Sequence, residues 1–146
     1  MSEELRYITY EEALEVYVKT VNASGGGLQG VKDEGGIRKV LDFVQNDCYY
    51  PTFIDKLTYL LYGLCTGHYF EDSNKCVALT IGVWFLVHNR YYWHACGFMQ
   101  CMEAIIYHVA AGRIDQDLLK RIIACYMKNE DYPESLKLDI IHAIDG

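Results

Sequence analysis

The stretch that decides the fold lies at positions 68–75 and reads His68-Tyr69-Phe70-Glu71-Asp72-Ser73-Asn74-Lys75. It leads directly into an apolar run over 74–89 that predicts a helix. Apolar residues point all round the axis of this helix, so we expect it to be central and buried. The octapeptide combines a base, a carboxylate, an amide and a cation, and the helix start adds free backbone N–H groups and a positive dipole end. Such a combination suits chemistry on a phosphate.

Further helices are expected on both sides of this central one. Thr9 and Glu12 form a capping box, so a first helix should cover about 10–22 and end at the glycine-rich stretch that follows. An apolar stripe with spacing i, i+3, i+4, i+7 predicts a second helix over about 36–45. The others are expected over 52–67, 95–111 and 115–128, with a last one that opens near Pro133 and ends near 144. The sequence therefore predicts a single all-α domain over residues 1–146, with about six to seven helices around a buried one.

Three short stretches are expected to be non-helical. Residues 28–33 should form a loop. In residues 47–51, Tyr49 and Tyr50 precede a proline, which suits a short extended segment or a β flap. The aromatic residues at 91–93 suit a short extended piece, where they either stack on a nucleobase or, as we favour, pack at the rim of the core.

Composition excludes several classes of protein. The formal net charge of −7 disfavours a nucleic-acid binder, which would need a basic face. No apolar run reaches the ~18 residues that a membrane span needs, and the acidic N-terminus lacks the apolar core of a signal peptide. The six cysteines contain no CxxC pair, which makes a redox or metal protein a weak reading. We therefore expect a cytoplasmic protein with reduced cysteines, no membrane contact and no nucleic-acid partner.

The pattern His68-x-Phe70-x-Asp72-x-Asn74-Lys75 resembles the signature of the Fic/Doc family, and its Asn-Lys pair resembles the Doc (death-on-curing) branch. The resemblance extends from about Tyr7 to Met127. It includes a glycine-rich loop after the first expected helix, a Gly-x-x-x-Val second helix, a flap-like segment and an Ala-Gly-x-Ile step before a late helix. The fold that this implies agrees with the one expected from the apolar pattern.

The resemblance also implies roles for individual residues. His68 would be the general base that takes a proton from a target hydroxyl, and Phe70 would anchor the loop to the core. Asp72 would hold Mg²⁺ at the phosphates of an ATP donor, which agrees with the preference of this ion for carboxylate oxygens. Catalysis would also involve Asn74 and Lys75. The nucleotide would be bound by four residues at the helix start: Ser73, Asn74, Lys75 and Cys76.

Two features depart from the family pattern. Cys76 stands where the Doc pattern has an arginine, and a cysteine cannot make a bidentate phosphate contact. Gly67 precedes the motif histidine, where Doc-type proteins tend to carry another arginine. The chain would then use a different donor, recruit Lys56 or Arg90 from elsewhere, or lack catalysis.

The implied function is that of a Doc-like toxin, which transfers a phosphate from ATP to a hydroxyl of elongation factor Tu. A separate antitoxin protein would inhibit it, and Tyr49 and Tyr50 would dock the target, a role that we weigh evenly against plain packing. Two alternatives remain: an AMP-transferring Fic enzyme, which Lys75 in the usual glycine position argues against, and a pseudo-enzyme that binds a protein or nucleotide partner. Read without the family, the octapeptide is a helix-capping loop in which Asp72 or Ser73 is the N-cap.

Overall fold

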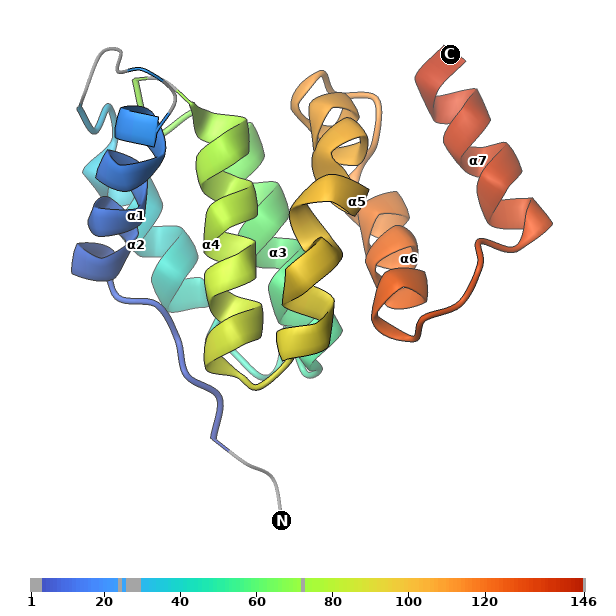
Figure 1. Cartoon of the computed structure of the whole chain (residues 1–146), viewed down its shortest axis with the longest axis horizontal. Helices are drawn as coiled ribbons and strands as arrows, with labels where there is room; N and C mark the ends of the chain where they lie inside the picture. The colour runs from blue at the N-terminus through green and yellow to red at the C-terminus, as the bar shows by residue number, and fades with distance from the viewer. Residues whose placement is uncertain (1–3, 24, 26–29, 72, 146) are drawn as a thin grey trace.

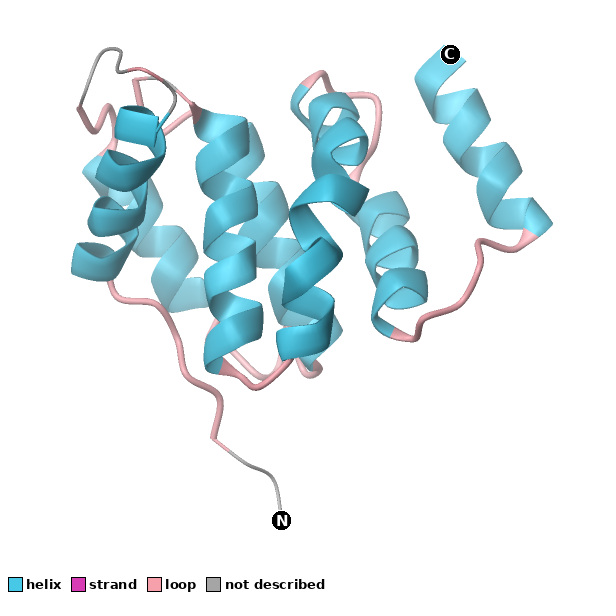
Figure 2. Ribbon diagram, in the orientation of Figure 1, coloured by secondary structure: helices cyan, strands magenta, loops and turns pink. Residues whose placement is uncertain are grey.

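The computed structural model describes residues 4–23, 25, 30–71 and 73–145. Within these residues the chain forms helices and no strand (Figures 1 and 2). The helices are α1 (Tyr10–Ala23), α2 (Glu34–Phe43), α3 (Phe53–Thr66), α4 (Asn74–His88), α5 (Tyr92–Ala110), α6 (Gln116–Met127) and α7 (Glu134–Asp145). The all-α prediction and the order of the helices are therefore confirmed.

Helix α4 stands at the centre of the molecule, as its apolar pattern predicts (Figure 1). It packs against α1, α3 and α5. Its buried residues are Val77, Ala78, Leu79, Ile81, Gly82, Phe85 and Leu86. Helix α4 begins, and the antiparallel helix α5 ends, at the same end of the bundle, where the loop after α3 also lies (Figure 1). The octapeptide therefore lies at this end of the bundle.

Local signals fix several helix starts. The Thr9–Glu12 capping box is confirmed, because each side chain accepts a hydrogen bond from the other residue's backbone N–H, at 3.1 and 3.0 Å. Helix α2 begins two residues earlier than expected, since the Asp33 carboxylate accepts from Gly36 N at 2.9 Å and caps it. Asp115 caps α6 in the same way, as the sequence predicts.

The prediction of a β flap at 47–51 is wrong for this structure, in which the segment forms consecutive turns. Asn46 causes the first of them, because its side-chain oxygen accepts from the backbone N–H groups of Cys48 and Tyr49. The buried Lys56 holds the segment from α3 by donating to the Val44 carbonyl at 3.1 Å and to the Asp47 carboxylate at 2.7 Å. The segment is therefore a turn-containing connection between α2 and α3 and not a strand.

The expected extended piece at 91–93 is also wrong. Tyr91 N donates to the Leu86 carbonyl at 2.8 Å and Ala95 N donates to the Tyr91 carbonyl at 2.9 Å, so the chain reverses within a few residues and α5 begins at Tyr92. Tyr92 and Trp93 lie in the first turn of α5 and are exposed.

The C-terminal helix α7 lies at the edge of the bundle (Figure 1). It packs on α6, with Leu136 as its buried residue. Over the described part of the chain, each helix is too short or too polar to cross a bilayer.

Candidate functional site

The octapeptide loop is fastened to the segment that precedes α2. The Tyr69 carbonyl accepts from the backbone N–H groups of Lys32 and Asp33 at 2.7 and 3.0 Å, and Glu71 N donates to the Gly30 carbonyl at 3.1 Å. Together with the isolated antiparallel bridge between Val31 and Phe70, these bonds pair the loop with residues 30–33. The loop therefore has a fixed backbone although it is a surface connection.

The ring of Tyr69 lies between two glycines that leave it room. A Cβ atom added to Gly67 would lie 2.7 Å from Cε1 of Tyr69 and closer still to Cζ and Cε2. A Cβ atom added to Gly36 would lie 2.5 Å from Cδ1 of the same ring and 2.9 Å from the Asp33 carboxylate. Such distances are too short for real Cβ atoms, so Tyr69 joins the end of α3 to the start of α2 only because both positions are glycine.

Phe70 turns into the core next to Tyr69. It is 1% exposed and stacks on Tyr17 of α1, with ring centroids 4.6 Å apart. The Tyr17 hydroxyl in turn accepts from Gly30 N at 2.9 Å, which ties the aromatic pair to the segment that the loop pairs with. Burial of this ring and the backbone pairing fix the loop from two sides.

The side chain of Asn74 joins the loop to α4. Its Oδ1 accepts from Phe70 N at 3.1 Å and its Nδ2 donates to the Phe70 carbonyl at 3.0 Å. Ser73, the residue before α4, has a φ of 64° and His68 has a φ of 51°. Few non-glycine residues adopt this left-handed region, and it persists where the surroundings hold it. His68 and Ser73, which lie on either side of Phe70, therefore both have a constrained backbone conformation.

The other residues expected at the site lie at this same end of the bundle. His68 is exposed, and Lys75 and Cys76 are exposed on the first turn of α4. Lys75 and Cys76 also line a groove of about 520 Å³ that runs between the start of α4 and the end of α5. Asp72 lies outside the described residues. The structure therefore brings a histidine and a lysine to the beginning of the central helix.

The protein-family model described as the Fic/DOC family matches residues 7–86. The match covers more than half of the chain and includes α1 to α3, the loop and nearly all of α4. The chain belongs to the Fic/DOC family. Members of this family usually transfer nucleotide or phosphate groups to proteins. No match was found among the curated proteins.

In this Fic/DOC chain, Tyr49 and Tyr50 lie in an aromatic cluster beside α2 and α3. Tyr50 stacks on Tyr59 at 4.4 Å and packs edge-on against Phe43, whereas Tyr49 is 67% exposed. Burial, with the neighbouring phenols of Tyr50 and Tyr69, raises the pKa of Tyr59 to about 12. Tyr59 is therefore a partly buried member of this cluster, and the exposed Tyr49 remains for contact with a partner.

Recruitment of Lys56 or Arg90 to the phosphate site does not occur. Lys56 is buried near the start of α3, about 15 Å along the helix from the loop end. Burial is the largest single influence and would lower the pKa of Lys56, but the Asp47 carboxylate and the Tyr7 phenol together outweigh it, so the pKa is raised. Arg90 follows the far end of α4, about 20 Å along the axis from Lys75. Both positions are at the opposite end of the bundle.

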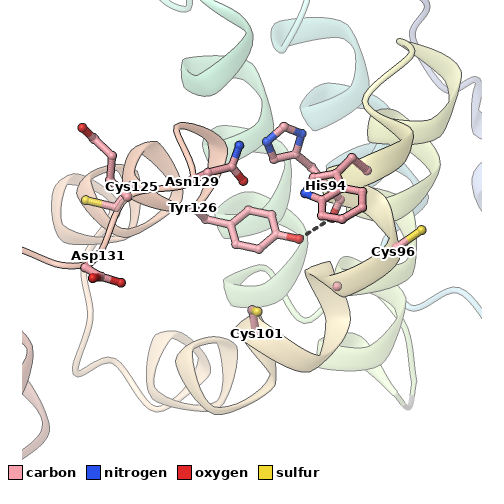
Figure 3. Close-up of a pocket in the computed structure, with 10 residues that line it drawn as sticks. His94, Cys96, Cys101, Cys125, Tyr126, Asn129 and Asp131 are labelled. Atoms are coloured by element: carbon pink, nitrogen blue, oxygen red, sulfur yellow. Dashed lines mark hydrogen bonds between the residues drawn. The ribbon is translucent and has the colours of Figure 1, made fainter.

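A second cavity of about 550 Å³ lies between α5 and α6 (Figure 3). Three cysteines line it, namely Cys96, Cys101 and Cys125. The Tyr126 hydroxyl donates to the His94 carbonyl there. Among the buried side-chain nitrogen and oxygen atoms of the described residues, Nε2 of His94 is the one without a hydrogen-bond partner. No group of three or more His, Cys, Asp or Glu side chains in the described residues is arranged to hold a metal ion.

Sequence reasoning did not find the partners of the loop. The backbone of Lys32 and Asp33, the two glycines around Tyr69 and the Tyr17–Gly30 bond are all distant in sequence from the motif. Gly36 carried the available signal, because a glycine inside a helical pattern often has a packing reason.

Proposed function

We propose that the chain is a Doc-like transferase that moves the γ-phosphate of ATP to a hydroxyl of a target protein. The observation that carries the proposal is the exposed His68 on a loop locked in place directly before the start of α4. The proposed target is elongation factor Tu, in the cytoplasm, and the proposed inhibitor is a separate antitoxin protein. Tyr49 is the proposed docking contact for the target, with Tyr50 as its support in the aromatic cluster.

The start of α4 is suited to an anion. The first backbone bond into the helix runs from Val77 N to the Ser73 carbonyl, so the N–H groups of residues 74–76 lack acceptors within the helix. The first turn of α4, all of which the structure describes, has no acidic side chain, whereas each of the other helices except α5 has one there. Lys75 adds an exposed ammonium group. These features favour a phosphate at this position.

In the proposed reaction the target hydroxyl oxygen forms a bond to the γ-phosphorus of ATP as the bond from that phosphorus to the β–γ bridging oxygen breaks. His68 accepts the hydroxyl proton, and ADP leaves with the electron pair of the broken bond. The carboxylate of Asp72 fits Mg²⁺, which binds proteins through one or two carboxylates together with substrate phosphates and would neutralise phosphate charge. Asn74 acts mainly by holding the loop, because both ends of its carboxamide bind Phe70.

A second candidate function is a pseudo-enzyme that binds a partner without turnover. The observation that favours it is the exposed Cys76 on the first turn of α4, where the thiol replaces a guanidinium that would hold phosphate. Transfer of AMP by the same site is the alternative within the enzyme class. Both candidates share the locked loop with the phosphate-transfer proposal. AMP transfer differs from it in the group added to the target, and the pseudo-enzyme adds none.

The test is mass spectrometry of elongation factor Tu after incubation with the protein, Mg²⁺ and ATP. We expect the mass of one phosphate to be added, and the addition to be lost in His68→Ala. His142→Ala is the matched control, because His142 is exposed on α7, which borders neither the loop nor the groove. A gain of AMP would replace the phosphate-transfer proposal by AMP transfer. No modification by a folded protein that binds ATP would favour the pseudo-enzyme.

A further inference from the structure

The groove between α4 and α5 has an uneven distribution of charge. At the end of the bundle where the loop lies, it is lined by Lys75 from the start of α4 and by His108 from the end of α5. Glu103, the acidic residue of the groove, lies about 7 Å further down α5 from His108. Lys75 and the imidazole of His108 therefore lie at the loop end of this groove, away from its carboxylate, in a chain whose net charge is −7.

Arg113 adds a guanidinium to this end. It belongs to the turn between α5 and α6, and its Nη1 lies 3.3 Å from Nδ1 of His108. A guanidinium can only donate, so Nδ1 of His108 accepts. The contact thus orders two side chains, one from α5 and one from the following turn, beside the same groove.

We propose that Arg113 and Lys75 bind the phosphate chain of the donor nucleotide at this end of the groove, with His108 as the residue that positions Arg113. The inference rests on the proposed function for the identity of the ligand and extends it to a residue outside the family match, which ends at position 86. Arg113 keeps four N–H donors after its bond to His108, enough for a bidentate phosphate contact. The site thereby gains the guanidinium that Cys76 cannot provide.

The backbone at Arg113 has a structural role that the side chain does not share. Its N–H donates to the His108 carbonyl at 2.9 Å, and Ile114 N donates to the same carbonyl at 3.3 Å, which closes the end of α5. These bonds persist when the side chain is shortened. The Arg113 side chain is exposed, so its removal should leave the fold intact and change ligand binding alone.

The experiment is isothermal titration of the full chain with two probes, Mg²⁺–ATP and inorganic tripolyphosphate. Arg113→Ala should weaken both affinities roughly 10- to 100-fold, the value for loss of a hydrogen bond between charged groups. The affinities of Arg113→Lys should lie between those of the wild type and Arg113→Ala, because lysine keeps the charge but cannot make the bidentate contact of a guanidinium. Arg121→Ala is the matched control, since Arg121 is an exposed arginine on α6 that pairs with Asp139. Melting temperatures recorded in parallel should agree among the four proteins.

The outcomes separate this inference from the proposed function. Equal affinities for wild type and Arg113→Ala, with phosphate transfer to elongation factor Tu retained, would overturn the role of Arg113 and leave the transferase standing. Binding of tripolyphosphate that depends on Arg113, in a protein that modifies no target, would support the phosphate site and remove the transferase. A wild-type protein that binds neither probe would overturn the phosphate site.

Discussion

Replacement of Gly67 by alanine tests whether the Tyr69 ring locks the octapeptide loop. Gly67 is the C-cap of α3, with φ −75° and ψ −20°, a conformation that alanine adopts freely. On backbone grounds alone, Gly67→Ala should stabilise the protein by about 0.4–1 kcal/mol. The added Cβ would, however, lie 2.7 Å from Cε1 of Tyr69 and closer to two other ring atoms. The ring cannot move toward α2, because Gly36 already lies against its other edge.

We therefore expect Gly67→Ala to destabilise the protein. Overpacking costs about 1–3 kcal/mol, which exceeds the backbone gain. At about 2–4 °C per kcal/mol for a domain of this size, the melting temperature should fall by several degrees. Gly35→Ala is the matched control, because its Cβ would have an ordinary separation of 3.6 Å from its nearest neighbour, the Asp33 carboxylate.

The assay is thermal and urea denaturation of the single variants and of Gly67→Ala combined with Tyr69→Ala. With the ring removed, Gly67→Ala should cost nothing further, so the two substitutions should be strongly non-additive. In the single variant the displaced ring should also move His68, and transferase activity should fall by about 100-fold, since a misplacement of about 1 Å has that effect. A Gly67→Ala protein as stable as Gly35→Ala would refute the reasoning.

Three further changes test other parts of the site and its surroundings. Asn74→Asp keeps the shape of the side chain but removes the donor to the Phe70 carbonyl, so urea denaturation should show a free energy of unfolding lower by about 1–3 kcal/mol. An unchanged midpoint would contradict the role of Asn74 in holding the loop. Cys76→Arg should raise the affinity for Mg²⁺–ATP in a calorimetric titration, and no change would mean that other groups suffice to hold the phosphates. The backbone N–H of Thr9 holds the pKa of Glu12 below its ordinary 4.5, so the stability that Glu12 contributes is complete above pH 4.5 and is lost as the pH falls through the lowered pKa. Glu12→Gln should therefore flatten the acid side of the pH–stability curve, which denaturation between pH 2 and 6 would show.

The helices could be predicted because their signals are local. Apolar periodicity and the capping residues Thr9 and Asp115 lie within the elements that they define, and the structure confirms them. The turns at 47–49 could not be predicted in the same way. They depend on Lys56, whose burial against the Val44 carbonyl and Asp47 arises only once α3 packs against the preceding segment. A long-range contact of this kind leaves no periodic trace in the sequence.

The candidate site likewise has a part that is local in sequence and a part that depends on long-range contacts. Its chemical groups lie within eight consecutive residues, so a sequence pattern is enough to find them. The groups that hold the loop come from α1, from the segment before α2 and from the end of α3, and only folding brings them together. The position of Arg113 also depends on folding, because Arg113 reaches the groove through its contact with His108 of α5.

The position of Asn74 limits how this site can hold phosphate. Both polar ends of its carboxamide bind the backbone of Phe70, so the loop takes one of the two donors and one of the two acceptor sites of Asn74. In the proposed site, most contacts to phosphate would then come from the backbone N–H groups of the first turn of α4 and from side-chain cations. Lys75 is the one lysine or arginine of the octapeptide, and Mg²⁺ at Asp72 would neutralise only part of the charge of ATP. In the proposed site Arg113 is the second side-chain cation, because the turn after α5 places it beside the groove that Lys75 lines.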